Sequence, residues 1–151
     1  MKIIPADISQ LELVQGIVQK TISAVYPHYY PAGAVKFFLH HHCTENIRCD
    51  LEAGRIWLLE AENSTTGTVT LKGNEICRLF VLPEYQARGY GRALMDFAEK
   101  TIAGQYPEIR LDASFPAKAI YLRRGYQPIS YHTVKTENGD FLCYDEMIKH
   151  I

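Results

Sequence analysis

The chain lacks the features of a membrane, secreted or nucleic-acid-binding protein. No apolar run approaches the roughly 20 residues that a membrane span requires, and the N-terminal stretch, with Lys2 and no long apolar segment, is unlike a signal peptide. The formal net charge is −1, from 16 basic and 17 acidic residues, so neither sign is in excess. We therefore expect a cytoplasmic protein whose main partner is neither a nucleic acid nor a membrane.

Cysteine pairs and metal-ligand clusters are also lacking. The cysteines show no Cys-x-x-Cys spacing, which predicts reduced thiols rather than a disulfide framework or a zinc site; they are Cys43, Cys49, Cys77 and Cys143. Three consecutive histidines, His40 to His42, suggest a metal site at first sight. Adjacent residues on a helix point about 100° apart, so these rings cannot converge on one ion. We expect no metal, with one histidine packed inward and the others facing solvent or a cleft.

The composition is typical of one globular domain over residues 1–151, with 47% apolar and 22% charged residues. Strand patterns occupy residues 2–6, 55–61, 66–72, 76–82, 109–113, 129–136 and 141–149. Gly73-Asn74 and Asn138-Gly139 predict tight hairpins between strands. Helical spacing predicts a helix that Asp7 or Ser9 caps and that ends before Pro27, a second over about 32–44, and a third from Tyr90. The sum is an α/β domain with one mixed sheet of about six or seven strands flanked by about four helices.

The most informative segment lies between the strand at 76–82 and the helix from Tyr90. It reads Gln86-Ala87-Arg88-Gly89-Tyr90-Gly91. A glycine-rich turn that leads into a helix offers unpaired backbone N–H groups and the positive end of the helix dipole. Gly89 and Gly91 let a ligand approach the backbone, and Arg88 and Arg92 add positive charge that suits phosphate. The segment therefore predicts a binding site for a phosphate or pyrophosphate.

Two common phosphate-binding motifs do not fit this segment. A Walker A loop needs Lys followed by Ser or Thr after its last glycine, and here Gly91 is followed by Arg92 and Ala93. The dinucleotide fingerprint needs a third small residue, and its place is taken by Leu94. The remaining alternative is a plain loop before a surface helix.

The order of strand, Gln-x-x-Gly-x-Gly and amphipathic helix resembles the GNAT superfamily of acyl-CoA N-acyltransferases. Residues 86–91 match the pyrophosphate loop of that family at every fixed position. A second segment, from Ala117 through Tyr121 to Gly125-Tyr126, is similar to the family's Ala-x-x-x-Tyr-x-x-x-Gly-Phe signature, with Tyr in place of Phe. The two close matches cover roughly residues 75–126. Ser114 departs from the pattern, because many relatives carry Asn or Gln there.

The resemblance implies a GNAT fold and a set of cofactor-binding residues. The strand that ends at Val81 would lie along the pantetheine arm of acetyl-CoA and bind it through backbone N–H groups. The implied cofactor-binding residues are Leu79, Phe80, Val81, Gln86, Ala87, Arg88, Gly89, Tyr90, Gly91, Arg92 and Ser114. No metal is implied.

The resemblance also implies roles in catalysis. Tyr121 is the candidate acid for the departing thiolate, since a phenol can donate a proton to a thiolate formed beside it; the alternative is a core aromatic. Glu75 is the candidate base, Asp112 is its rival, and water could relay the proton with no dedicated base. The alternatives for the two carboxylates are a solvated hairpin residue and a turn or capping residue.

The function that follows is an acetyl-CoA-dependent N-acetyltransferase that acts on a small-molecule or peptide amine, as a monomer or homodimer. The alternative is a non-catalytic acyl-CoA-binding module. By resemblance, the region of the first helices helps to form the acceptor wall. Its aromatic residues would suit an amine with an apolar or cationic body, with core packing as the alternative; they are Tyr26, Tyr29, Tyr30, Phe37 and Phe38.

Overall fold

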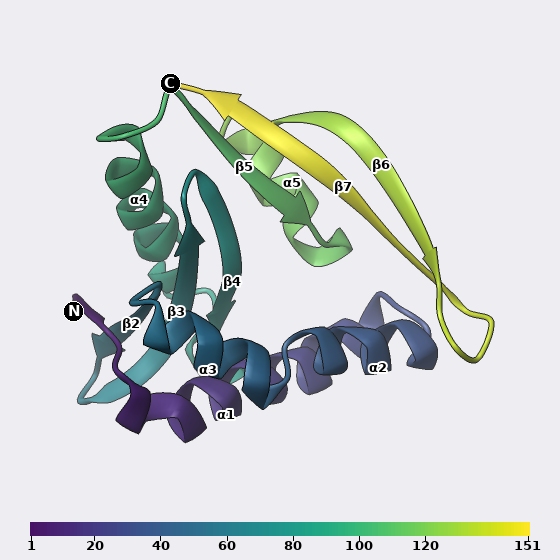
Figure 1. Ribbon diagram of the computed structural model, residues 1–151, viewed down its shortest axis with the longest axis horizontal. Coiled ribbons are helices and arrows are strands. Elements are labelled where there is room, and N and C mark those ends of the chain that lie inside the picture. Colours follow the sequence, from purple (N-terminus) through teal and green to yellow (C-terminus); the bar gives the residue numbers. More distant parts are fainter.

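A computed structural model describes all 151 residues and contains one mixed sheet of seven strands (Figure 1). The spatial order is β1-β2-β3-β4-β5-β7-β6, and every neighbouring pair is antiparallel except β4–β5. This is the mixed α/β architecture that the sequence predicted. The strands are β1 (Lys2–Pro5), β2 (Ile56–Ala61), β3 (Ser64–Lys72), β4 (Glu75–Val81), β5 (Glu108–Ala113), β6 (Gln127–Lys135) and β7 (Phe141–His150).

Helices cover both faces of the sheet. They are α1 (Leu11–Val25), α2 (Ala32–His41), α3 (Thr44–Glu52), α4 (Tyr90–Ala103) and α5 (Phe115–Arg123). On one face α4 packs on β3, β4 and β5, around a core that includes Leu94, Ile102 and Leu111. On the other face α1 packs on β3 and β4 and contacts α2 and α3, around a second core that includes Ile17, Ile22 and Leu58. None of these helices is both long and apolar enough to cross a membrane.

Local sequence explains where the first helices begin and end. The Asp7 side chain accepts a hydrogen bond from the backbone N–H of Ser9 and caps a short 3₁₀ turn that leads into α1. The helix buries Val14, Ile17 and Val18, as their spacing predicted, and ends at Val25, ahead of Pro27. The hairpin turns also lie where the sequence placed them, and both Gly73 and Gly139 have positive φ.

The region between α2 and β2 differs from the expected pattern. The helix expected over about 32–44 ends at His41, and α3 follows it from Thr44 to Glu52. The sequence analysis missed α3, which buries only Ile47, Asp50 and Leu51. Two apolar positions four residues apart give no extended stripe, so the periodicity that marks the other helices is absent here.

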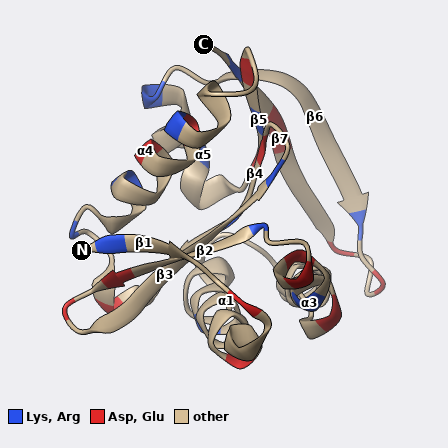
Figure 2. Ribbon diagram, turned by 60° about the vertical axis from the view of Figure 1, so that its left-hand side comes forward, with Lys and Arg blue, Asp and Glu red and all other residues tan.

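The sheet divides between β4 and β5. The two strands pair only at Glu75–Arg110 and Ile76–Leu111, and then diverge toward their carboxyl ends, as both views show (Figures 1 and 2). Beyond Ile76, no strand pairs with that edge of β4. The register between β3 and β4 also shifts near this point, and Arg78 adopts a φ of 35°, which is unusual for a residue with a side chain.

A buried ion pair holds this irregular part of β4. The Arg78 guanidinium lies 2.5 Å from a carboxylate oxygen of Asp50 on α3, and both side chains are almost fully buried. Arg78 also donates a hydrogen bond to the Thr70 hydroxyl on β3. A buried charge needs such partners because the interior cannot solvate it. The unpredicted helix α3 thus supplies the counter-ion for the bulged strand.

Candidate active site

The loop 86–91 presents unused hydrogen-bond donors. No backbone N–H group from Ala87 to Arg92 donates a hydrogen bond within the protein. Ala87 and Gly89 have positive φ, of 61° and 85°, which turns successive N–H groups toward one side of the chain. Nothing lies within 4 Å of the place where a Cβ of Gly89 would be. The loop is therefore open and rich in donors, and it can receive a phosphate group.

The loop is fixed to the end of β4 by a side chain of its own motif. The Gln86 amide donates a hydrogen bond of 3.0 Å to the backbone carbonyl of Val81. A methyl group of Val81 lies 3.9 Å from the place where a Cβ of Gly91 would be. The first residue of the motif thus ties the loop to the strand, and its last glycine permits α4 to begin close to that strand.

The positive charge on the loop has an internal partner. Arg88 donates to both carboxylate oxygens of Glu62, at 2.9 and 2.8 Å, and the Tyr90 hydroxyl donates to the same carboxylate at 2.5 Å. The hydrogen bond from Tyr90 and the ion pair with Arg88 lower the pKa of Glu62, which stays ionised. In the free protein, Glu62 therefore pairs with the Arg88 guanidinium, which the sequence predicted to bind phosphate. The sequence analysis missed Glu62, which lies in the β2–β3 turn and far from the loop in the chain.

A cleft of about 250 Å³ lies where β4 and β5 diverge. Besides β4 and β5, residues of α2, α5, β6, β7 and the turn at Tyr26 contribute to its lining, which is mostly apolar. The predicted catalytic and cofactor residues that it brings together are Glu75, Leu79, Phe80, Asp112, Ser114 and Tyr121. Of the aromatic residues expected at the acceptor wall, Tyr26, Phe37 and Phe38 line the cleft, whereas Tyr29 and Tyr30 do not. The other lining residues include His41, His42, Cys77, Arg78, Val134, Leu142 and Tyr144. Val81 and the loop residues are not part of this lining.

Tyr121 lies on α5 and reaches the cleft from the side of the α4 core. Its side chain is 9% exposed, and its ring packs edge-on against Tyr126 with ring centres 5.8 Å apart. Burial raises the pKa of Tyr121 above that of a free phenol, so the hydroxyl keeps its proton. Tyr121 is therefore both a core residue and a protonated group in contact with the cleft.

The two candidate bases lie on adjacent strands, and both line the cleft. Burial and the nearby carboxylates of Glu75 and Glu146 raise the pKa of Asp112 above its ordinary value. A carboxylate whose pKa is raised in this way is a better proton acceptor than a fully solvated carboxylate. The structure thus keeps both Glu75 and Asp112 as candidates.

Two histidines of the sequence 40–42 contribute to the cleft. His42 packs edge-on against Phe80, and burial lowers its pKa to about 3, so the imidazole is neutral. His41 stacks on Phe37, and burial lowers its pKa as well. His40 is exposed. This matches the expectation of one inward-packed histidine, and no group of three metal-ligand side chains occurs in the structure.

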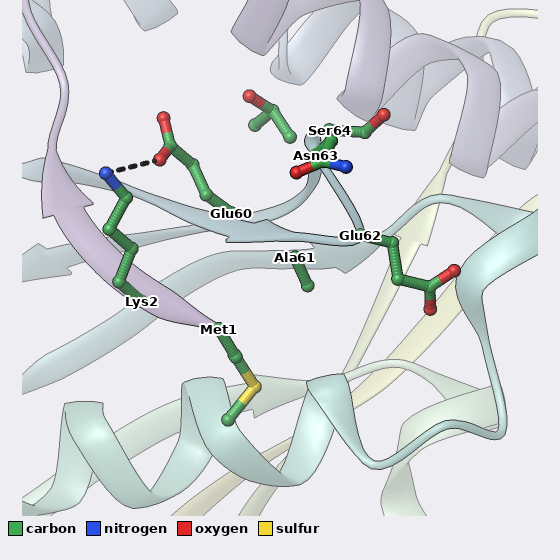
Figure 3. A pocket seen from close by; sticks show the side chains of 8 residues that line it. Met1, Lys2, Glu60, Ala61, Glu62, Asn63 and Ser64 are labelled. Atoms are coloured by element: carbon green, nitrogen blue, oxygen red, sulfur yellow. Dashed lines mark ion pairs between the residues drawn. The ribbon is translucent and has the colours of Figure 1, made fainter.

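A second hollow of about 550 Å³ lies away from the cleft, between the N-terminus and the β2–β3 turn (Figure 3). Most of its lining is polar, and Lys2 pairs with Glu60 across it at 3.1 Å. Figure 3 shows the Glu62 side chain pointing away from that pair. The hollow brings together none of the predicted site residues, and all four cysteines are free and lie outside it.

Several residues of the cleft were not predicted from the sequence. Arg78 lines the cleft, and its partner Asp50 lies outside the lining and far away in the chain; the only sequence signal of this pair is a charged residue inside an otherwise apolar strand. Tyr144, on β7, stacks on His132 of β6 with ring centres 4.8 Å apart. Its place in the cleft depends on how the β6–β7 hairpin returns over α2, where the backbone N–H of Gly33 donates to the Asp140 carboxylate.

Solved structures with the same fold include several acetyltransferases. A GCN5-related N-acetyltransferase from Rhodopseudomonas palustris has a TM-score of 0.89 at 22% identity, over 99% of this chain and 95% of that one. The PaiA N-acetyltransferase from Thermoplasma acidophilum, solved with coenzyme A, has a TM-score of 0.71 at 19% identity, over 99% and 98%. A ribosomal-protein-alanine N-acetyltransferase from Brucella melitensis has a TM-score of 0.70 at 14% identity, over the whole of both chains. At these identities the likeness shows the fold.

The family itself is shown by a sequence model. No curated protein sequence matches the chain significantly. The model of the acetyltransferase (GNAT) domain matches residues 25–141, a range that contains the loop 86–91, Tyr121 and most residues of the cleft between β4 and β5. The chain therefore belongs to the GNAT acetyltransferase family.

Proposed function

We propose that the protein is an acetyl-CoA-dependent N-acetyltransferase that moves an acetyl group directly to a primary amine. The observation that carries this proposal is the adjacency of two features: a loop with unused N–H donors, and a cleft lined by a protonated Tyr121 and two carboxylates. Membership of the GNAT family supports acetyl transfer in general. The coenzyme A in the related T. acidophilum structure supports the choice of co-substrate.

We assign each part of the co-substrate to residues of the chain. The N–H groups from Ala87 to Arg92 would bind the pyrophosphate, with Arg88 and Arg92 supplying charge. The edge of β4 from Leu79 to Val81, which no strand covers, would pair with the pantetheine arm as an added strand does. Ser114 lines the cleft at the start of α5, where a hydroxyl can replace the amide that many relatives carry.

Acetyl-CoA supplies a thioester carbon that the neutral amine attacks, and the C–S bond then breaks. Glu75 takes the proton that the amine loses, with Asp112 as the rival for that role. Tyr121 gives its proton to the departing thiolate and regains one from solvent, so the products are an N-acetyl amine and free CoA thiol. The β4 backbone N–H groups near Leu79 would stabilise the developing oxyanion.

Two measurements test this proposal. Acetyl-CoA should bind in the micromolar range and raise the melting temperature, with a gain of about 2.7 kcal/mol at 100 times its dissociation constant. Incubation with acetyl-CoA and a broad amine panel should release free thiol. A response to ATP or NAD with none to acetyl-CoA would refute the cofactor assignment. Binding of acetyl-CoA without thiol release from any amine would instead indicate a non-catalytic binding module.

A further inference from the structure

The lining of the cleft includes two carboxylates that no cation of the protein neutralises. Glu75 and Asp112 lie on neighbouring strands and both line the cleft. Neither forms an ion pair, although ion pairs occur throughout the rest of the molecule. Asp112 also lies opposite Glu146 in the β5–β7 ladder, and the Glu146 carboxylate pairs with Arg110 at 3.6 Å.

The cations near the cleft are already paired. Arg78 is the only lysine or arginine in the lining, and it lies 2.5 Å from Asp50. Arg110, two residues before Asp112, bonds to Glu108 at 2.9 Å. The histidines of the lining add no charge at neutral pH, because burial lowers the pKa of His42 to about 3 and lowers that of His41 as well. The cleft therefore presents a net negative field to whatever enters it.

The walls around these carboxylates are apolar and aromatic. Phe37 of α2 and Tyr144 of β7 contribute aromatic rings, and Val134 and Leu142 of the β6–β7 hairpin contribute aliphatic side chains. Ring faces attract cations, and aliphatic surface favours a chain of methylene groups. Apolar walls with two unpaired carboxylates fit a ligand that has an apolar body and positive charge at more than one point.

We propose that the acceptor is a diamine: an amine on an apolar spacer that carries a second positive charge and no carboxylate. The inference rests on the proposed transfer to an amine and names the class of that amine. Asp112 holds the distal ammonium, and Glu75 faces the ammonium that is to lose its proton and react. An acceptor with a carboxylate finds no free cation in the cleft and meets two like charges, so the site selects against it.

A matched series of three acceptors isolates the second charge. Hexane-1,6-diamine, hexylamine and 6-aminohexanoate share a six-carbon chain and one reacting amine, and differ at the far end by a positive, an absent and a negative charge. We expect kcat/KM, measured by thiol release from acetyl-CoA, to fall in that order. The diamine should exceed hexylamine about tenfold and the amino acid by more. Equal values for the diamine and hexylamine, or a preference for 6-aminohexanoate, would overturn the inference.

Two variants assign the preference to Asp112. In Asp112→Asn, the ratio of kcat/KM for the diamine to that for hexylamine should fall to about one; the ratio is taken within one variant, so a general loss of activity does not affect it. Glu12→Gln removes an exposed carboxylate of α1 that forms no ion pair and lies outside the cleft, and it should keep the wild-type ratio. An unchanged ratio in Asp112→Asn would refute the role of Asp112.

Failure of the inference is distinct from failure of the proposed function. If acetyl-CoA binds and other amines of the broad panel release thiol while the diamine does not, the acceptor class is wrong and the acetyltransferase remains. If acetyl-CoA does not bind and no amine releases thiol, the proposed function is refuted and the diamine inference with it.

Discussion

The proposed cofactor side and the proposed acceptor side of this molecule are built in different ways. The proposed cofactor side is one continuous segment, residues 86–92, whose backbone N–H groups from Ala87 to Arg92 have no partner within the protein. The acceptor side consists of side chains from α2, β4, β5, α5, β6 and β7, brought together by the divergence of two strands. A site made of backbone tolerates few changes in conformation, whereas a site made of side chains can change its ligand without a change of fold.

The strongest test of this contrast is Gly89→Val. Gly89 has a φ of 85°, and its missing Cβ faces open space where a phosphate would approach. A β-branched side chain disfavours that φ and fills the space, so we expect CoA binding to fall below detection while the fold remains. Isothermal calorimetry with CoA measures the effect.

Gly54→Val is the matched control for this change. Gly54 also has a positive φ, of 66°, and open space around its missing Cβ, but it lies after α3 and away from the loop. It should lose similar stability and keep its affinity for CoA. CoA binding by Gly89→Val at wild-type strength would place the pyrophosphate elsewhere.

On the acceptor side, the largest expected effect is that of Tyr121→Phe. The change keeps the ring that packs on Tyr126 and removes only the hydroxyl. Loss of the general acid should lower kcat roughly 100-fold with little change in acetyl-CoA binding. Steady-state kinetics beside a melting curve measure both.

Tyr126→Phe removes a neighbouring hydroxyl that is also buried and that has no hydrogen-bond partner. It should leave turnover unchanged, and it shows what loss of a nearby hydroxyl does by itself. Full activity in a stable Tyr121→Phe variant would leave Tyr121 as a core residue only.

The same contrast explains how much the sequence predicted. The loop, α4 and the strand before them were predictable because their signal is local: glycines, a motif of six residues and an apolar stripe. The seven strands were predictable for the same reason, since alternation and turn residues lie within each one. GNAT membership, inferred from residues 75–126, is confirmed.

Part of the acceptor side could not be predicted, because the contacts that complete it join distant parts of the chain. Asp50 neutralises Arg78 from a helix that buries few apolar residues and therefore has little periodicity. Tyr144 depends on the path of a long hairpin. Even the loop has a non-local partner in Glu62, which no spacing rule connects to Arg88.

Acid should reduce stability through His42 on the acceptor side, whereas the cofactor loop has no group that titrates between pH 5 and 8. Burial lowers the pKa of His42 from 6.5 to about 3 in the folded state. The folded protein favours the neutral imidazole. The contribution of His42 to the free energy of unfolding is therefore fully present above pH 6.5 and is lost as the pH falls toward 3. Between pH 8 and pH 5 the loss from His42 is about 2 kcal/mol.

His42→Gln removes this titration and should make the free energy of unfolding less sensitive to acid by that amount. Urea denaturation at pH 8 and pH 5 measures the difference for each protein. His40→Gln, which changes an exposed histidine of the same run, should follow the wild type. Equal acid sensitivity of wild type and His42→Gln would show that the imidazole is solvated rather than buried.

The smallest expected effect is on the cofactor side, and it is a gain in affinity for CoA. Glu62 holds Arg88 in the free protein, and a bound phosphate competes with it for the guanidinium. Glu62→Gln removes the negative charge, so CoA should bind about two- to fivefold more tightly, the scale of an exposed ion pair. Glu60→Gln is the matched control, because Glu60 pairs with Lys2 instead of Arg88 (Figure 3). Arg88→Ala should weaken CoA binding by about 1–3 kcal/mol, and in that background Glu62→Gln should have no further effect. A tighter-binding Glu62→Gln that does not depend on Arg88 would mean that the carboxylate acts by general repulsion of the phosphates, and weaker binding would mean that Glu62 positions Arg88 for the ligand.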